Sequence, residues 1–352
     1  MKIRLAIIDN NQAYLNRISA ALSAKYSDKI EIYSFSDDKA ASAALGSADV
    51  VLAHEEYDID VNPIPKRCAF ARLIDRQGVD RVNGCSAVCR FQRVDVIYKQ
   101  ILNLYSEVAA NLSGTRSGSS RQTHFFVFSS PCGGVGTSTV AAACARHFAS
   151  QDKRTLYLNL EKFGEAGLFF SGVGQFNLSD IILALKNRKA NLQIKLESCV
   201  RQDASGVFFF CEPTLALDRM ELSSDEILRL VKELELSNQY DYIIVDIDFS
   251  LDTDMKKIYR YADALIWVSD GSLVANRKTE RAYECIETIN SAERTSGSDM
   301  VLLIDNKSSG AEKKLPQGKN LRCVGTLPQY KAADTNQLLA GLASFDIFEK
   351  IG

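Results

Sequence analysis

Short apolar runs alternate with amphipathic segments along most of the chain, which is the pattern of strands alternating with helices. Residues 3–8 form a compact apolar run, and residues 12–25 place apolar side chains at helical spacing. Residues 124–129 and 136–149 repeat this order further along. The run 242–245 is continuously apolar, as expected of a strand buried on both faces. The pattern predicts an α/β protein with two doubly wound sheets.

The other expected elements follow the same alternation. A capping box of Ser223 or Ser224 with Glu226 is expected to begin one helix, and Asp37 or Asp38 is expected to cap another. Strands are expected at 30–35, 50–53, 68–73, 87–91, 155–160, 207–211, 264–268, 300–304 and 322–326, and helices at 38–45, 94–108, 178–186, 224–236, 277–291 and 337–342.

One segment interrupts the alternation. Residues 110–123 are rich in Ser, Gly and Arg and almost free of bulky apolar side chains, which is the composition of a linker. The chain has 352 residues, enough for about two domains. We therefore expect a domain over residues 1–109, a linker over 110–123 and a second domain over 124–352.

Charge and composition exclude several classes of protein. The chain has 42 basic and 44 acidic residues, so its net charge of −2 disfavours broad binding to nucleic acid. No apolar run approaches the roughly 18 residues of a membrane span, and the first residues have no signal-peptide core, so we expect a cytoplasmic protein. Nine cysteines without a CxxC, with only three histidines, favour reduced thiols over a zinc site.

The segment Ser130–Thr139 (SPCGGVGTST) follows an expected strand and begins an expected helix. This is the context of a phosphate loop, in which glycines let backbone N–H groups and the helix N-terminus approach an anion. The hydroxyl of Ser138 is placed to hold Mg²⁺.

This loop resembles the deviant Walker A motif of the MinD/ParA-type ATPases, KGGxGK followed by Ser or Thr. Cys132 stands where that family has its signature lysine, and Thr137 stands where phosphate-loop enzymes have the phosphate-binding lysine. The resemblance implies ATP as ligand, with Mg²⁺, and it assigns to ATP the residues Cys132, Gly133, Gly134, Val135, Gly136, Thr137, Ser138 and Thr139.

The two missing lysines change the expected chemistry. Losing one preorganised donor to transition-state charge costs about 10²–10³ in rate. Binding should suffer less, because the N–H groups and Mg²⁺ remain. We therefore expect nucleotide binding with at most slow, Mg-dependent hydrolysis.

Two other strand ends resemble motifs of the same family. Asp246 follows the apolar run at 242–245 and resembles the Walker B carboxylate, which implies that it holds Mg²⁺ through a water molecule. Asn159 and Glu161 stand where relatives carry two aspartates, so Glu161 is a candidate catalytic carboxylate. Lys162 is a candidate for the missing charge. Polar residues at ordinary strand ends are the competing interpretation.

Two further segments carry the same resemblance. Residues 302–307 resemble the family segment whose Asn reads the adenine edge, which assigns Asn306 to ATP. Residues 325–328 resemble the loop that closes over the base and assign Pro328. The resemblance also implies a homodimer through this domain.

The first domain resembles the flavodoxin-like receiver of response regulators. That domain needs two acidic residues after its first strand, an acceptor Asp after its third and a Lys after its fifth. Here Asp9 is followed by Asn10, His54 occupies the acceptor position and Arg90 lies in the lysine region. We therefore expect an unphosphorylated module that binds proteins, with Asp9 and Arg90 as a structural ion pair.

A degenerate receiver, a linker and a deviant MinD/ParA-type domain occur together in the TadZ/CpaE family of pilus-assembly proteins, which this chain resembles over its whole length. The resemblance implies an ATP-dimerised scaffold for tight-adherence (Flp, type IVb) pili. It also implies pilus-assembly and secretion proteins as partners of the receiver-like domain, and a position at a cell pole or the inner membrane reached through them.

Two alternatives stay open at this point. One is an actively cycling, MinD-like positioning ATPase. Its relatives end in a basic amphipathic helix, whereas residues 342–352 hold two acids and one base, and Phe345 and Phe348 are expected to pack on the domain. The other is a signalling regulator, for which no helix–turn–helix pattern follows the linker. We expect neither direct membrane insertion nor nucleic-acid binding.

Overall fold

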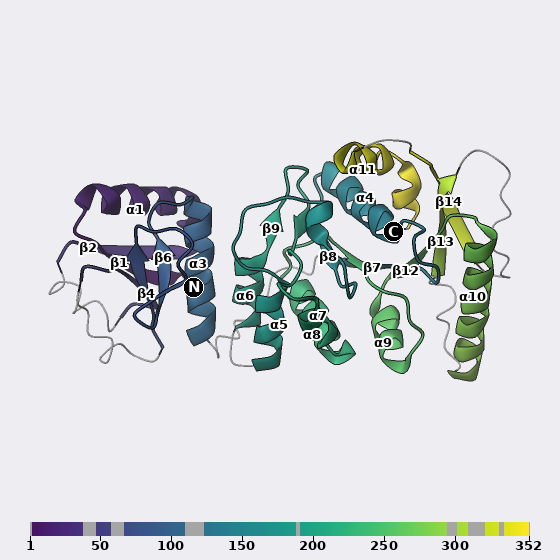
Figure 1. Ribbon diagram of the computed structural model, residues 1–352, viewed down its shortest axis with the longest axis horizontal. Helices are drawn as coiled ribbons and strands as arrows, with labels where there is room; N and C mark the ends of the chain where they lie inside the picture. Colours follow the sequence, from purple (N-terminus) through teal and green to yellow (C-terminus); the bar gives the residue numbers. More distant parts are fainter. Residues whose placement is uncertain are drawn as a thin grey trace. The chain divides into compact units, whose positions relative to one another are not determined.

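The computed structural model describes residues 2–37, 47–57, 67–109, 123–187, 191–293, 301–308, 321–330 and 334–351. The expected helix at 38–45 and the expected linker, except Thr123, lie outside the described residues. The contacts between residues divide the chain into two compact units (Figure 1). The first comprises Met1–Arg116, Gly174–Phe176 and Leu183–Cys199, and the second comprises Ser117–Val173, Asn177–Ile182 and Val200–Gly352.

The first unit contains a six-stranded sheet in the order β2-β1-β3-β4-β6-β5. All neighbouring strands are parallel except β5 and β6, which form an antiparallel pair. The strands are β1 (Ile3–Ile8), β2 (Ile30–Phe35), β3 (Val50–His54), β4 (Ala69–Ile74), β5 (Arg81–Val82) and β6 (Cys85–Cys89).

Two long helices pack against this sheet and each other: α1 (Gln12–Tyr26) and α3 (Val94–Val108). The α1 helix begins where the Asn11 side chain accepts a hydrogen bond from the backbone N–H of Tyr14, at 3.0 Å. A short helix from later in the chain, α6 (Leu192–Cys199), belongs to this unit and packs on α3. Ile194 of α6 joins the unit's apolar core.

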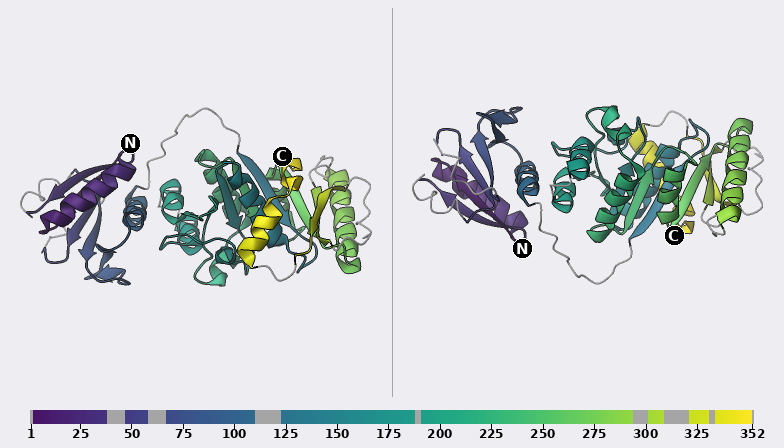
Figure 2. Two further views of the ribbon diagram at one scale, coloured as in Figure 1. Left: turned by 90° about the horizontal axis from the view of Figure 1, so that it is seen from above. Right: turned by 90° about the horizontal axis from the view of Figure 1, so that it is seen from below.

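The second unit contains an eight-stranded sheet in the order β14-β13-β12-β7-β11-β8-β10-β9, parallel except at β9. Helices cover both faces of this sheet, α4 and α11 on one and α8 and α9 on the other (Figures 1 and 2). The strands are β7 (His124–Ser129), β8 (Thr155–Asn159), β9 (Arg201–Gln202), β10 (Phe208–Phe209), β11 (Tyr242–Asp246), β12 (Ala264–Ser269), β13 (Val301–Ser308) and β14 (Arg322–Pro328).

The helices that follow β7 in the chain differ from the sequence prediction mainly where they are short. The α8 helix has the predicted bounds and begins with the predicted capping box of Ser223 and Glu226. The sequence pattern missed α6, α7 and α9, none longer than nine residues. The helices and helical turns after β7 are α4 (Thr137–Ser150), η1 (Ala166–Leu168), α5 (Leu178–Asn187), α6 (Leu192–Cys199), α7 (Ala216–Met220), α8 (Ser224–Leu236), α9 (Thr253–Tyr261), α10 (Leu273–Glu293), α11 (Thr335–Ala343) and η3 (Asp346–Lys350).

The chain's last turns pack on the second unit. Phe348 of η3 is fully buried and Phe345 lies against the same apolar core. This confirms the predicted packing of both rings. In the part of the chain that the structure describes, no helix is long and apolar enough to cross a membrane.

These observations confirm the predicted fold class, an α/β protein with two mainly parallel sheets. In the second sheet β11 lies between β7 and β8, and the register pairs Asp246 with both Phe128 and Asn159. Because the carboxyl ends of parallel strands share one edge of a sheet, the loops that follow β7, β8 and β11 meet there.

Candidate functional site

The candidate phosphate loop connects β7 to α4 at this edge of the second sheet. Gly134 has φ of 79° and Gly136 has φ of 92°, a backbone region that glycine adopts without a steric penalty. Gly136 is the residue from which α4 begins. A fourteen-residue helix therefore points its N-terminus, with its free N–H groups, at the space beside the loop, which suits an anionic ligand.

The end of β13 braces the outer side of this loop. Asn306 is buried and its Nδ2 donates to the carbonyl oxygen of Val135 at 2.9 Å. Lys307 donates through Nζ to the carbonyl oxygen of Gly134 at 2.6 Å. A Cβ at Gly136 would lie 2.6 Å from Asn306 Nδ2, so glycine is required there for steric reasons as well. The adenine-reading role of Asn306 stays a prediction, and so does that of Pro328, which pairs with Ser308 at the end of β14.

Three oxygen-bearing side chains meet beside the loop. Ser138, in the first turn of α4, donates through Oγ to Glu161 Oε2 at 2.9 Å. Asp246, at the end of β11, is fully buried, and its Oδ1 has no hydrogen-bond partner among the described residues. Burial raises the pKa of Asp246 well above its usual range, and the neighbouring charge of Glu161 raises it further. A cation at this point would relieve both effects.

Tyr157 and Asn159, both on β8, hold these carboxylates in place. The Tyr157 hydroxyl donates to Asp246 Oδ2 at 2.8 Å, and Asn159 Nδ2 donates to the Tyr157 oxygen at 3.2 Å. Asn159 Oδ1 in turn accepts from the backbone N–H of Glu161 at 3.0 Å. Burial raises the pKa of Tyr157 well above its usual range, so the hydroxyl keeps its proton and remains a donor.

The donor set of Ser138, Glu161 and Asp246 fits Mg²⁺, which binds one or two carboxylates and completes its shell with waters and phosphate oxygens. No cluster of three or more His, Cys, Asp or Glu side chains suited to a metal occurs among the described residues. A magnesium ion here would therefore share its shell with a phosphate ligand. It would polarise that phosphate and neutralise part of its charge.

The two positions without lysine carry no positive charge in the structure. Cys132 and Thr137 are both half-buried at the loop and the first residue of α4. Lys162, the sequence candidate for the missing charge, is exposed, while its backbone N–H donates to Asp248 Oδ2 at 2.8 Å. Neither Lys307 nor Tyr157 was singled out from the sequence. Lys307 could have been found because it follows Asn306 directly. No feature of the sequence marked Tyr157.

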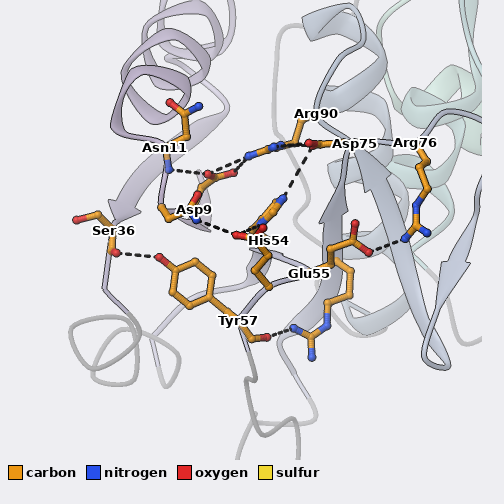
Figure 3. Close-up of polar contacts among 12 residues, drawn as sticks. Asp9, Asn11, Ser36, His54, Glu55, Tyr57, Asp75, Arg76 and Arg90 are labelled. Carbon is orange, nitrogen blue, oxygen red and sulfur yellow. Dashed lines mark hydrogen bonds and ion pairs between the residues drawn. The ribbon is translucent and has the colours of Figure 1, made fainter.

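A second polar cluster lies at the strand ends of the first unit, where a receiver has its phosphorylation site (Figure 3). Asp9 is fully buried after β1. Arg90, just after β6, donates through Nη1 to both carboxylate oxygens of Asp9 at 3.0 and 2.7 Å, as the sequence suggested. Its Nε and Nη2 bond Asp75 at 2.5 and 2.7 Å. The bond from Arg90 lowers the pKa of Asp75.

His54 occupies the acceptor position at the end of β3. It is 5% exposed, and neither ring nitrogen has a hydrogen-bond partner among the described residues. Its Nδ1 lies 3.5 Å from Glu56 and its Nε2 lies 3.9 Å from Asp75. The Asn10 amide donates to Glu56 Oε2 at 2.8 Å. The position thus offers an imidazole in place of the acceptor carboxylate, and Arg90 neutralises the carboxylates beside it.

Comparison with known proteins finds a family model that matches the N-terminal residues and solved structures that resemble about two thirds of the chain. Residues 1–106 match a family model described as "TadZ-like, receiver domain". A ParA family ATPase from Chlorobium tepidum TLS aligns with 66% of this chain and 97% of its own, at 20% identity and a TM-score of 0.52. No curated protein matches the sequence.

Two other solved structures align at lower TM-scores. The septum site-determining protein MinD of Pyrococcus horikoshii OT3, complexed with Mg-ADP, has a TM-score of 0.47 at 14% identity, covering 63% of this chain and 95% of its own. A putative plasmid partition protein of Borrelia burgdorferi B31, bound to AMPPNP, has a TM-score of 0.45 at 20% identity, covering 65% and 97%.

The chain therefore comprises two α/β modules, one with a candidate receiver-type site and one with a candidate phosphate loop. The chain consists of an N-terminal TadZ-like receiver domain and a C-terminal domain with the fold of the MinD/ParA-type ATPases.

Proposed function

We propose that this protein is a nucleotide-gated scaffold. The C-terminal domain binds Mg·ATP, dimerises in response and hydrolyses the nucleotide slowly. One observation carries the proposal: the loop, its helix N-terminus and the Ser138, Glu161 and Asp246 oxygens are assembled beside one another, while both lysine positions are uncharged. Such a site suits ligand binding better than fast phosphoryl transfer.

Each residue of the site has a part in this scheme. The backbone N–H groups around Gly134 and Gly136 face the phosphates, and Asn306 keeps the loop in shape from behind. Ser138 and Asp246 are the Mg²⁺-side oxygens. Glu161, hydrogen-bonded to Ser138, is the candidate to orient water, at a rate limited by the missing positive charge.

Dimerisation through this domain is supported by apolar side chains exposed next to the site. Phe163 is 80% exposed and Leu168 is 61% exposed, and both follow Glu161 within seven residues. Large apolar side chains left in solvent are material for a protein–protein contact. A dimer that prefers the ATP-bound form needs only a higher affinity of ATP for the dimer than for the monomer.

The receiver-like domain is proposed as the partner-binding module. Arg90 fills the place where phosphoryl chemistry would need free carboxylates, so a phosphorylation switch is not part of the proposal. The TadZ-like receiver supports a role in assembling tight-adherence pili, with pilus-assembly and secretion proteins as partners. We place the protein in the cytoplasm, at a cell pole or beside the inner membrane through those partners.

The test is a titration of Mg·ATP into the full chain. Calorimetry measures binding, and light scattering measures the oligomeric state. We expect binding accompanied by dimerisation, and loss of both in Gly136→Val, whose side chain would collide with the Asn306 amide. Gly206→Val is the matched control, because Gly206 has φ of 89° but a Cβ there would meet only ordinary contacts. A dimer fraction independent of ATP would contradict the gating, and absence of ATP binding would contradict the nucleotide site.

A further inference from the structure

The short helix α7 has an unusual distribution of side chains. Leu217 is 66% exposed and Met220 is 42% exposed, whereas Arg219 between them is 6% exposed. Burying an arginine while leaving two apolar side chains in solvent is the reverse of what core packing favours. The inversion indicates that Arg219 points inward for a reason other than apolar packing.

The guanidinium of Arg219 bonds the backbone next to the proposed nucleotide site. Its Nε donates to the carbonyl oxygen of Leu160 at 2.7 Å. Leu160 joins Asn159, at the end of β8, to Glu161, whose carboxylate accepts from Ser138 of the phosphate loop. The backbone N–H of Leu160 donates to the carbonyl oxygen of Asp246 at 2.7 Å. Arg219 therefore bonds a peptide segment whose next residue is Glu161 and which is hydrogen-bonded to the backbone of Asp246.

The charge of Arg219 is incompletely balanced. Across the described ranges, no carboxylate lies within ion-pair distance of Arg219. Its hydrogen bond to the Leu160 carbonyl oxygen uses Nε alone. Burial lowers the pKa of Arg219, and the charge of Asp248 opposes that effect. A buried cation needs compensating negative charge, and a guanidinium has five N–H donors arranged to bind phosphate oxygens in pairs.

We propose that Arg219 is a phosphate-binding residue of the nucleotide site and supplies part of the positive charge lost at Cys132 and Thr137. This inference rests on the proposed function, because the anion it completes is the phosphate chain of the bound nucleotide. Arg219 comes from outside the loop, on a helix 80 residues beyond it, so no loop motif marks it. Its role differs from that of Lys307, whose Nζ bonds a backbone carbonyl oxygen of the loop.

The competing role is purely structural: Arg219 would only hold the 160–162 backbone in place. The two roles differ in what they predict for a ligand with phosphates but no base. A phosphate-binding arginine changes the affinity for inorganic tripolyphosphate and its salt dependence. A structural arginine changes the melting temperature and leaves the affinity for tripolyphosphate as it is.

The experiment measures the dissociation constants of Mg·ATP, tripolyphosphate and adenosine by calorimetry, at two salt concentrations, with melting temperatures recorded alongside. We expect Arg219→Gln to weaken ATP and tripolyphosphate by about tenfold or more, consistent with loss of a charged hydrogen-bond pair, and to leave adenosine unchanged. Arg219→Lys should weaken them less. Arg322→Gln, on the exposed start of β14, is the matched control and should change nothing.

Equal affinity for tripolyphosphate in Arg219→Gln and wild type would overturn the inference. If Arg219→Gln does not fold, Arg219→Lys decides, since it keeps the charge but loses the paired donors: a several-fold loss is expected, and no loss overturns the inference. Wild-type binding of tripolyphosphate without ATP would contradict the proposed function alone, and the variants would still test Arg219. Binding of neither would overturn both.

Discussion

The guanidinium of Arg90 bonds both carboxylate oxygens of the fully buried Asp9, at 3.0 and 2.7 Å, across the strand ends of the first unit. In a receiver, the equivalent carboxylate needs oxygen atoms that no other side chain occupies in order to take part in phosphoryl chemistry. Here the arginine occupies those oxygen atoms and also bonds Asp75. Asp9, Asp75 and Arg90 therefore form a charge-paired structural cluster.

Replacing Arg90 tests this structural role. Arg90→Met leaves Asp9 buried without its partner, so we expect a loss of about 3–5 kcal/mol in the free energy of unfolding. Urea unfolding of the full chain, followed by far-ultraviolet circular dichroism, measures it. The double variant Asp9→Asn with Arg90→Met removes the uncompensated charge and should recover part of the loss. A single variant as stable as wild type would show that the ion pair with Asp9 does not stabilise the fold.

Asp246 should make the ligand-free protein less stable as the pH rises. Its pKa is raised in the folded state, chiefly by burial, so the protonated form is favoured there. The stabilising contribution is present below the unfolded pKa of about 3.9 and is lost as pH rises toward the folded pKa. We therefore expect Asp246→Asn, which removes the buried charge, to stabilise the ligand-free protein at neutral pH by about 1–3 kcal/mol, the usual cost of an unsatisfied buried polar group.

The same variant should abolish stabilisation by Mg·ATP beyond that of ATP alone. Melting curves between pH 5 and pH 8, with and without Mg·ATP, measure both effects. Asp225→Asn is the matched control, because the Asp225 side chain is 78% exposed. A ligand-free Asp246→Asn protein less stable than wild type would mean that the hydrogen bond from Tyr157 outweighs the cost of the buried charge.

The sequence predicted most strands of both sheets because most of them are apolar runs with polar ends, but it missed the two-residue strands β5 and β9. The α8 helix was predicted to the residue because Ser223 and Glu226 mark its start and its apolar stripe runs from Ile227 to Leu234. The α7 helix escaped prediction because five residues are too few for a periodic pattern, and α9 escaped because it buries only Ile258 and Tyr259.

The candidate site was predictable only where a residue lies within a contiguous motif. Glycine spacing marked the phosphate loop, and strand ends marked Asp246 and Glu161. Tyr157 lies inside an apolar strand, so the sequence pattern predicts an ordinary core residue, although its hydroxyl donates to Asp246. Arg219 reads as a surface residue of a short helix, and only its 6% exposure separates it from other arginines. These contacts depend on tertiary packing, which no local pattern encodes.

Restoring the lysine of the phosphate loop should restore hydrolysis. Thr137 is the first residue of α4, where phosphate-loop enzymes place a lysine against the transferred phosphate. Because Ser138, Glu161 and Asp246 are already assembled beside it, we expect Thr137→Lys to raise the rate of ATP hydrolysis by about 10²–10³. Thr137→Met, of similar length without charge, should leave the rate unchanged, and adding Asp246→Asn to Thr137→Lys should remove the gain. Single-turnover release of phosphate measures all three. An unchanged rate in Thr137→Lys would contradict the prediction and show that the missing lysine is not what limits hydrolysis.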